Sequence, residues 1–150
     1  MEKNKFNHVN YLWDKKKEEA LGDDQVDLFL YRSNILGADL RITNFGGGNT
    51  SCKTIEKDPI TNKDVEVMWI KGSGGDIGTL KRNGIAGLYN QRLHDLKKVY
   101  RGLDYEDEMV PLFNHCIYKL DSRAPSIDTP LHGLLPFKHI DHLHPDALIS

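Results

Sequence analysis

Two glycine-rich turns, each directly after an expected strand, limit the fold of this chain more than any other feature. The first, at residues 46–48, separates strand-like sequence at 40–44 and 50–54, and the second, at 72–75, follows an alternating apolar and polar run at 65–69. Such alternation is typical of strands with one buried face. Glycine-rich turns expose successive amide N–H groups, which suit an anion. Neither turn matches a nucleotide-binding loop, and either alone could be purely structural.

The other elements are expected to be mostly helices. Asp23 and Asp24 can cap a helix with apolar residues at helical spacing up to Leu36, which Gly37 would end. Further helices are expected over 85–102, 110–120 and 128–135, and a further strand over 139–144. This mixture predicts an α/β domain over residues 23–150, with its sheet covered by helices, after a polar lead-in at 1–22.

Composition narrows the class of protein. The chain has 150 residues, 39% of them hydrophobic, and a net charge of −2, which is typical of one globular domain and gives no reason to expect nucleic acid as a partner. Its apolar runs are too short to span a membrane, and its N-terminus lacks a secretory signal. Cys52 and Cys116 are read as reduced thiols. We therefore expect a cytoplasmic protein.

The last residues suggest that the domain continues. Residues 146–150 are expected to open an apolar strand, yet no turn or polar tail follows them. A strand cut off there would leave backbone groups and apolar side chains without partners. The chain is therefore expected to be the N-terminal part of a longer domain.

His142 and His144 have the spacing of a metal-binding pair. Side chains two residues apart on a strand point to the same face, so two imidazoles can converge on one ion. Asp141 and Asp146 are close enough in sequence to orient the far ring nitrogens. The alternative is a pair of polar surface histidines, and a catalytic zinc would still need a third ligand, which does not follow His144 here.

Asp128 lies shortly before the histidine pair, in the segment 126–132. A carboxylate near a metal and shielded from water can act as a base, since its surroundings set its pKa and orientation. Alternatively, Asp128 only caps the short helix behind it. Spacing alone does not decide between the two.

These motifs, in this order, resemble the class II aldolase/adducin family, and the resemblance covers the chain from about Tyr31 to the end. The ordered pieces are a Gly-Gly-Asn-Thr-Ser turn at 47–51, Lys-Gly-Ser-Gly at 71–74, Ser-x-Asp at 126–128 and the His-x-His pair. The longer strings at 31–37, 41–51 and 136–146 look most like the aldolase portion of the bifunctional rhamnulose-1-phosphate aldolase/alcohol dehydrogenase branch.

The resemblance implies a three-layer αβα domain with a largely antiparallel central sheet, usually in a homo-oligomer. It assigns zinc to His142 and His144, with a third histidine beyond Ser150, and acid/base catalysis to Asp128, where better-known members carry Glu. His132 is a weaker candidate at a position that the family often fills with His. The implied phosphate-binding residues are Asn49, Ser51, Ser73 and Gly74.

The implied reaction is zinc-dependent cleavage of a ketose 1-phosphate, rhamnulose 1-phosphate in this branch, to dihydroxyacetone phosphate and lactaldehyde. NAD would belong only to a dehydrogenase portion outside these residues, which contain no dinucleotide-binding fingerprint. The alternatives are a sugar-phosphate epimerase or dehydratase with the same metal site, and a non-catalytic interaction module as in adducin.

Overall fold

A four-stranded antiparallel sheet with strand order β3-β2-β1-β4 forms the middle of the molecule in a computed structural model that describes residues 11–149. The strands are β1 (Asn49–Lys57), β2 (Asp64–Lys71), β3 (Ile85–Tyr89) and β4 (His139–His142). The α-helices are α1 (Lys15–Leu21), α2 (Gln25–Gly37), α3 (Asn90–Asp95), α4 (Thr129–Leu134) and α5 (Asp146–Ile149). The 3-10 helices of the described residues are η1 (Ile77–Thr79), η2 (Arg82–Gly84), η3 (Leu96–Lys98) and η4 (Leu103–Cys116).

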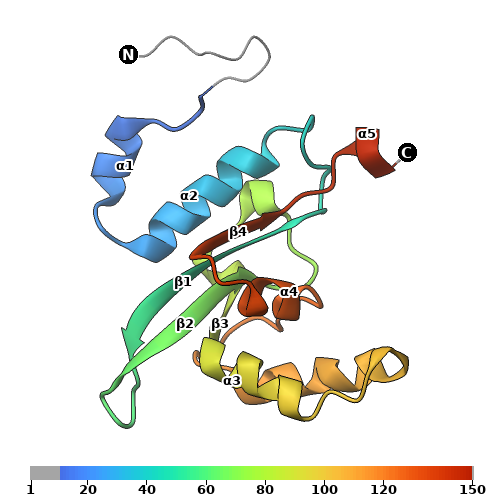
Figure 1. Ribbon diagram of the computed structural model, residues 1–150. Helices are drawn as coiled ribbons and strands as arrows, with labels where there is room; N and C mark the ends of the chain where they lie inside the picture. The colour runs from blue at the N-terminus through green and yellow to red at the C-terminus, as the bar shows by residue number, and fades with distance from the viewer. Residues whose placement is uncertain (1–10, 150) are drawn as a thin grey trace.

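Helices cover both faces of the sheet, as Figure 1 shows, so the predicted three-layer α/β architecture is confirmed. The helix α2 packs on one face, where Phe29 and Leu30 meet Cys52, Val67 and Trp69. On the other face, α3 and η4 contribute a second cluster of Leu93, Phe113 and Cys116 against Met68, Ile70, Ala86 and Leu88. Alternate residues of β2 therefore serve the two clusters, as the pleat of a strand requires.

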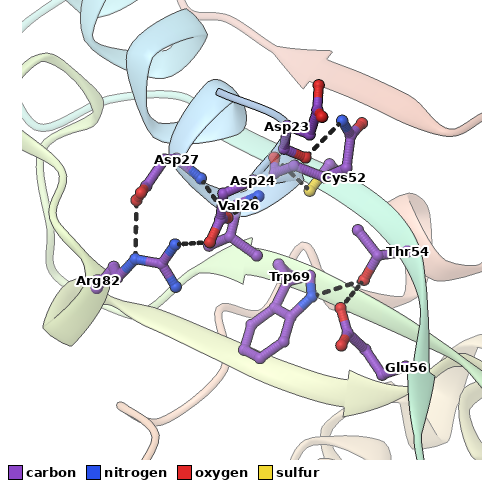
Figure 2. Close-up of polar contacts among 10 residues, drawn as sticks. Asp23, Asp24, Val26, Asp27, Cys52, Thr54, Glu56, Trp69 and Arg82 are labelled. Atoms are coloured by element: carbon purple, nitrogen blue, oxygen red, sulfur yellow. Dashed lines mark hydrogen bonds and ion pairs between the residues drawn. The ribbon is translucent and has the colours of Figure 1, made fainter. Parts of the chain in front are cut away.

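The helix α2 begins where the two aspartates predict it. The Asp24 carboxylate accepts hydrogen bonds from the backbone N–H groups of Val26 and Asp27, at 2.9 and 3.0 Å, and so satisfies two donors that a helix leaves free at its start. The Arg82 guanidinium joins this cap by ion pairs to Asp24 and Asp27, as Figure 2 shows. The cap thus ties α2 to the short helix η2.

The apolar spacing of residues 85–102 predicts one long helix, and this prediction is wrong. Residues 85–89 form β3, and a helical turn follows only at α3. The residues from Ile85 to Leu88 are all buried, and a fully buried strand shows no alternation that would separate it from a helix. Tertiary burial on both faces therefore decided this element.

Two smaller expectations are also wrong, and a third is right only in part. Residues 40–42 form turns and residues 43–44 lie outside any strand, and Leu40 is exposed. The segment 146–149 is the helix α5 and not an opening strand, with Leu148 and Ile149 exposed. The helix expected over 110–120 is the longer 3-10 helix η4, which ends at Cys116. Within residues 11–149, none of the helices is both long and apolar enough to cross a membrane.

Candidate active site

The two glycine-rich turns meet at one end of the sheet. The antiparallel register of β1 and β2 places Ser51 opposite Ile70, so the first residues of β1 lie beside the last residues of β2. The turn before β1 and the turn after β2 are therefore neighbours. The Gly46 N–H donates a hydrogen bond to the Asp76 carboxylate at 3.1 Å and joins them directly.

Two further segments reach the same end of the sheet. The chain before α4 runs beside the second turn, where Gly72 bridges Pro125 and the Ser73 N–H donates to the Ala124 carbonyl at 2.9 Å. The strand β4 pairs with β1 and sets His142 opposite Asn49. All four motifs identified in the sequence thus converge in space, although β4 lies about ninety positions after the first turn.

The two histidine rings converge on one another. The strand β4 ends at His142, and the Asn44 N–H continues the pairing by donating to the His144 carbonyl at 3.0 Å. The Nε2 atoms of His142 and His144 are 3.2 Å apart. Two nitrogen ligands of a tetrahedral zinc, each at about 2.0–2.1 Å, would stand roughly 3.3–3.4 Å apart. The pair therefore fits a shared ion. Nevertheless, residues 11–149 hold no cluster of three or more His, Cys, Asp or Glu side chains placed to bind a metal.

The first turn needs glycine because the histidine segment passes close to it. A Cβ at position 48 would lie 2.8 Å from the His142 carbonyl oxygen, and Gly48 has a φ of 74°, a conformation that side-chain-bearing residues rarely adopt. A Cβ at position 47 would lie 3.2 Å from His144 Nδ1. Gly48 therefore lets the turn approach the backbone of the histidine segment, whereas a Cβ at position 47 would clash first with Asn44 Oδ1.

Asp128 faces the histidine pair. It occupies the N-cap position of α4, but its side chain makes no capping hydrogen bond, so capping does not explain the residue. Its Oδ2 accepts hydrogen bonds from Asn49 Nδ2 at 3.2 Å and Ser126 Oγ at 3.1 Å. Its Oδ1 lies 3.6 Å from His142 Nδ1.

Asp141 does not orient a histidine ring. It lies on the opposite face of β4 from His142 and pairs with Arg32 of α2 at 3.0 Å. The alternation of a strand imposes this, because adjacent residues point to opposite faces. Asp128, which is distant in sequence, has the position beside His142 Nδ1 that a ring-orienting carboxylate would take.

The four residues expected to bind phosphate divide between the two turns. Asn49 and Ser51 are buried in β1, and Asn49 Oδ1 has no hydrogen-bond partner among the described residues. Ser73 and Gly74 are exposed in the second turn. The structure brings Asn49 to Asp128 and places the two turns side by side. The roles of all four in phosphate binding stay predictions.

His132 belongs to the site more closely than the sequence indicates. Its ring has no exposed surface, and burial lowers its pKa to about 4. Nδ1 lies 2.7 Å from Ser51 Oγ, while Nε2 has no hydrogen-bond partner within the described part of the chain. The signals in the sequence are its position one helical turn after Asp128 and the family resemblance, which marks it as a weaker candidate. No sequence pattern points to Asp76, which directly follows the second turn and joins it to the first.

Comparisons with known proteins agree with this architecture. No family model matches the chain. It is 43% identical over 143 residues, 95% of its length, to the uncharacterized oxidoreductase YuxG of Bacillus subtilis (strain 168), and spans 20% of that protein. A solved structure of the N-terminal class II aldolase domain of a conserved protein from Thermoplasma acidophilum matches with a TM-score of 0.75 and 28% identity. That match covers 99% of this chain and 62% of the other. The chain therefore has a class II aldolase-like fold.

Proposed function

We propose that this chain is a zinc-dependent aldolase domain that cleaves a ketose 1-phosphate, with rhamnulose 1-phosphate as the expected substrate. The observation that carries the proposal is the convergence of His142 Nε2 and His144 Nε2, 3.2 Å apart, beside Asp128 and the glycine-rich turns. The similarity to a class II aldolase domain supports it. Dihydroxyacetone phosphate and lactaldehyde would be the products.

His142 and His144 would hold the metal, with a third ligand from outside the described residues. Bound zinc would supply Lewis-acid stabilisation of the negative charge that develops on the substrate oxygen during carbon–carbon cleavage. The donor set suits zinc, because neutral imidazole nitrogens are among its usual ligands in catalytic sites.

Asp128 would move the proton. Aldol cleavage requires a base to take the proton of a substrate hydroxyl group, and the proton is then returned to carbon. Asn49 and Ser126 both donate to Oδ2, which fixes the plane of the carboxylate. This leaves Oδ1, on the side of the histidine pair, to accept the proton.

Asn49, Ser51, Ser73 and Gly74 would hold the substrate phosphate. Side-chain amide and hydroxyl groups and a backbone N–H in a glycine turn are suitable donors to an anion. Anchoring the phosphate at the turns would place the reacting carbons of a short sugar beside the histidines. Such positioning lowers the entropic cost of the reaction.

We further propose that a longer chain pairs this domain with an NAD-dependent dehydrogenase. The similarity to YuxG, a protein named as an oxidoreductase of which this chain matches about a fifth, supports this pairing. Oxidation or reduction of the aldehyde product would then follow cleavage within one protein.

The direct test is cleavage of rhamnulose 1-phosphate by the full-length protein. We expect chelation to abolish cleavage and Zn²⁺ to restore it. His142→Ala should lose zinc and activity together, whereas Asp128→Asn should keep zinc and lose turnover by about 10²-fold or more, as for a lost general base. His139→Ala is the matched control, since His139 lies on the other face of the same strand and should retain zinc.

Each outcome assigns a role. Cleavage that survives exhaustive chelation contradicts the proposal. Zinc loss in Asp128→Asn would make Asp128 an orienting partner of His142 instead of the base. Stoichiometric zinc with epimerisation or dehydration of sugar phosphates, and no cleavage, would favour the alternative enzymes. Absence of zinc from the purified protein would favour an interaction module.

A further inference from the structure

Arg123 lies alongside the second glycine-rich turn. The Ser73 N–H donates to the Ala124 carbonyl at 2.9 Å, and Gly72 bridges Pro125, so the chain on either side of Arg123 is fixed to the turn. The position of Arg123 is therefore set by backbone pairing.

The side chain of Arg123 runs across the face of this turn. A Cβ at position 72 would lie 2.8 Å from both Arg123 Cβ and Cγ, and 2.9 Å from Cδ. A Cβ at position 74 would lie 3.5 Å from Arg123 Nη2. The aliphatic stem thus occupies the space that glycine leaves free at 72, and the guanidinium ends over Gly74.

Among the residues that the structure describes, the charge of Arg123 is not compensated by a carboxylate. Each of the other arginines donates to a carboxylate or a carbonyl: Arg32, Arg41, Arg82, Arg92 and Arg101. Within residues 11–149, the guanidinium of Arg123 has no hydrogen bond or ion pair. Its stem packs against Gly72, so an exposed guanidinium lies over the turn with its donors available to a ligand.

Several other charged groups lie close to Arg123 at this end of the sheet. The Lys71 Nζ donates to the Gly75 carbonyl at 2.7 Å inside the same turn. Burial lowers the pKa of Lys71, and the positive charge of Arg123 lowers it further, while Asp128 and Asp76 raise it. Arg123 therefore acts electrostatically on the same small region as the candidate base.

We propose that Arg123 is the cationic phosphate-binding residue of this site, with its guanidinium closing over a phosphate group held on the turn 72–75. The four residues expected at the phosphate are neutral, and a phosphate dianion gains most from a planar guanidinium that donates two parallel hydrogen bonds. The phosphorylated substrate class follows from the proposed function, but phosphate binding by Arg123 is testable without it.

The test compares Arg123→Gln, Arg123→Lys and Arg101→Gln in the full-length protein. Arg101 is the matched control because it is an exposed arginine that lies just before η4 in the chain and pairs with Glu108 at 3.1 Å. The first probe is inorganic phosphate, titrated by calorimetry. We expect Arg123→Gln to weaken phosphate binding roughly 10-fold or more, as for the loss of hydrogen bonds to a charged group. Arg123→Lys should recover part of the affinity, and Arg101→Gln should bind as the wild type does.

The second readout is steady-state cleavage of rhamnulose 1-phosphate. For Arg123→Gln we expect a KM raised by a similar factor and a smaller change in kcat. If the wild type binds phosphate through Arg123 but cleaves no ketose phosphate, the binding inference holds and the aldolase proposal fails. If cleavage occurs and neither KM nor phosphate affinity changes in Arg123→Gln, the inference on Arg123 is overturned while the aldolase proposal holds. A wild type that does not bind phosphate also overturns it.

Discussion

At the scale of single residues, the contact between His132 and Ser51 decides what the Ser51 hydroxyl can do. A neutral imidazole has one nitrogen that donates and one that accepts. If Nδ1 donates to Ser51 Oγ across the 2.7 Å contact, the hydroxyl proton stays free to be given to a phosphate oxygen. Nε2 then carries only a lone pair. A buried acceptor without a hydrogen-bond partner is less rare in proteins than a buried N–H without one.

Burial of His132 makes stability depend on pH. Its pKa is lowered to about 4, below the roughly 6.5 of an unfolded histidine, so the unfolded chain binds more protons between these values. The stabilisation is complete above about pH 6.5 and is lost as the pH falls toward 4. Around His132, Asp128 raises the pKa, whereas His142, Lys53 and Arg32 lower it.

Urea denaturation at several pH values checks this prediction. His132→Asn should show a shallower fall of unfolding free energy between pH 6.5 and 4 than the wild type. An equal slope in both proteins would contradict it. Should the variant not fold, NMR titration of the His132 ring in the wild type measures its pKa directly, and a value near 6.5 would equally contradict the prediction.

At the scale of elements, the start of α2 depends on one carboxylate of a pair. Asp24 caps two N–H groups (Figure 2). Within residues 11–149, its neighbour Asp23 takes part through its backbone carbonyl alone, which accepts a hydrogen bond from Gln25 Nε2. Asp24→Ala should lower the unfolding free energy by about 1 kcal/mol, mainly through the lost cap. The ion pair to Arg82 is exposed and adds little.

Chemical denaturation of both alanine variants measures this difference. Asp23→Ala is the control and should stay within about 0.5 kcal/mol of the wild type. Equal destabilisation by the two substitutions would show that the cap is not the source. Since α2 packs on one face of the sheet, the loss of unfolding free energy in Asp24→Ala also shows how much the start of α2 contributes to the stability of the fold.

At the scale of the whole molecule, the candidate site is assembled from segments that only the sheet brings together. A ligand that binds the folded chain and not the unfolded chain stabilises the fold by about 2.7 kcal/mol at a hundred times its Kd. Zinc should therefore raise the Tm of the full-length protein in calorimetry.

Two of these variants show whether the rise in Tm comes from zinc bound at the histidine pair. His142→Ala should abolish the zinc-dependent rise in Tm. Asp24→Ala should start from a lower Tm and show the same rise, because the hydrogen bonds and ion pair of Asp24 are to Val26, Asp27 and Arg82 and not to the histidine pair. A rise that persists in His142→Ala would mean that zinc binds elsewhere.

The amino-acid sequence alone determined the layered α/β class, the start of α2 and the short helix α4, because caps and apolar periodicity are local properties. It also singled out the histidine pair, both glycine turns and Asp128, since each is a short motif. Only the tertiary structure decided that residues 85–89 form a strand, because burial on both faces removes the alternation that identifies one. It alone showed that Asp128 and not Asp141 faces the His142 ring, that His132 is buried against Ser51, and that Arg123 lies beside the second turn. These contacts join residues far apart in the chain, and no local pattern encodes such distances.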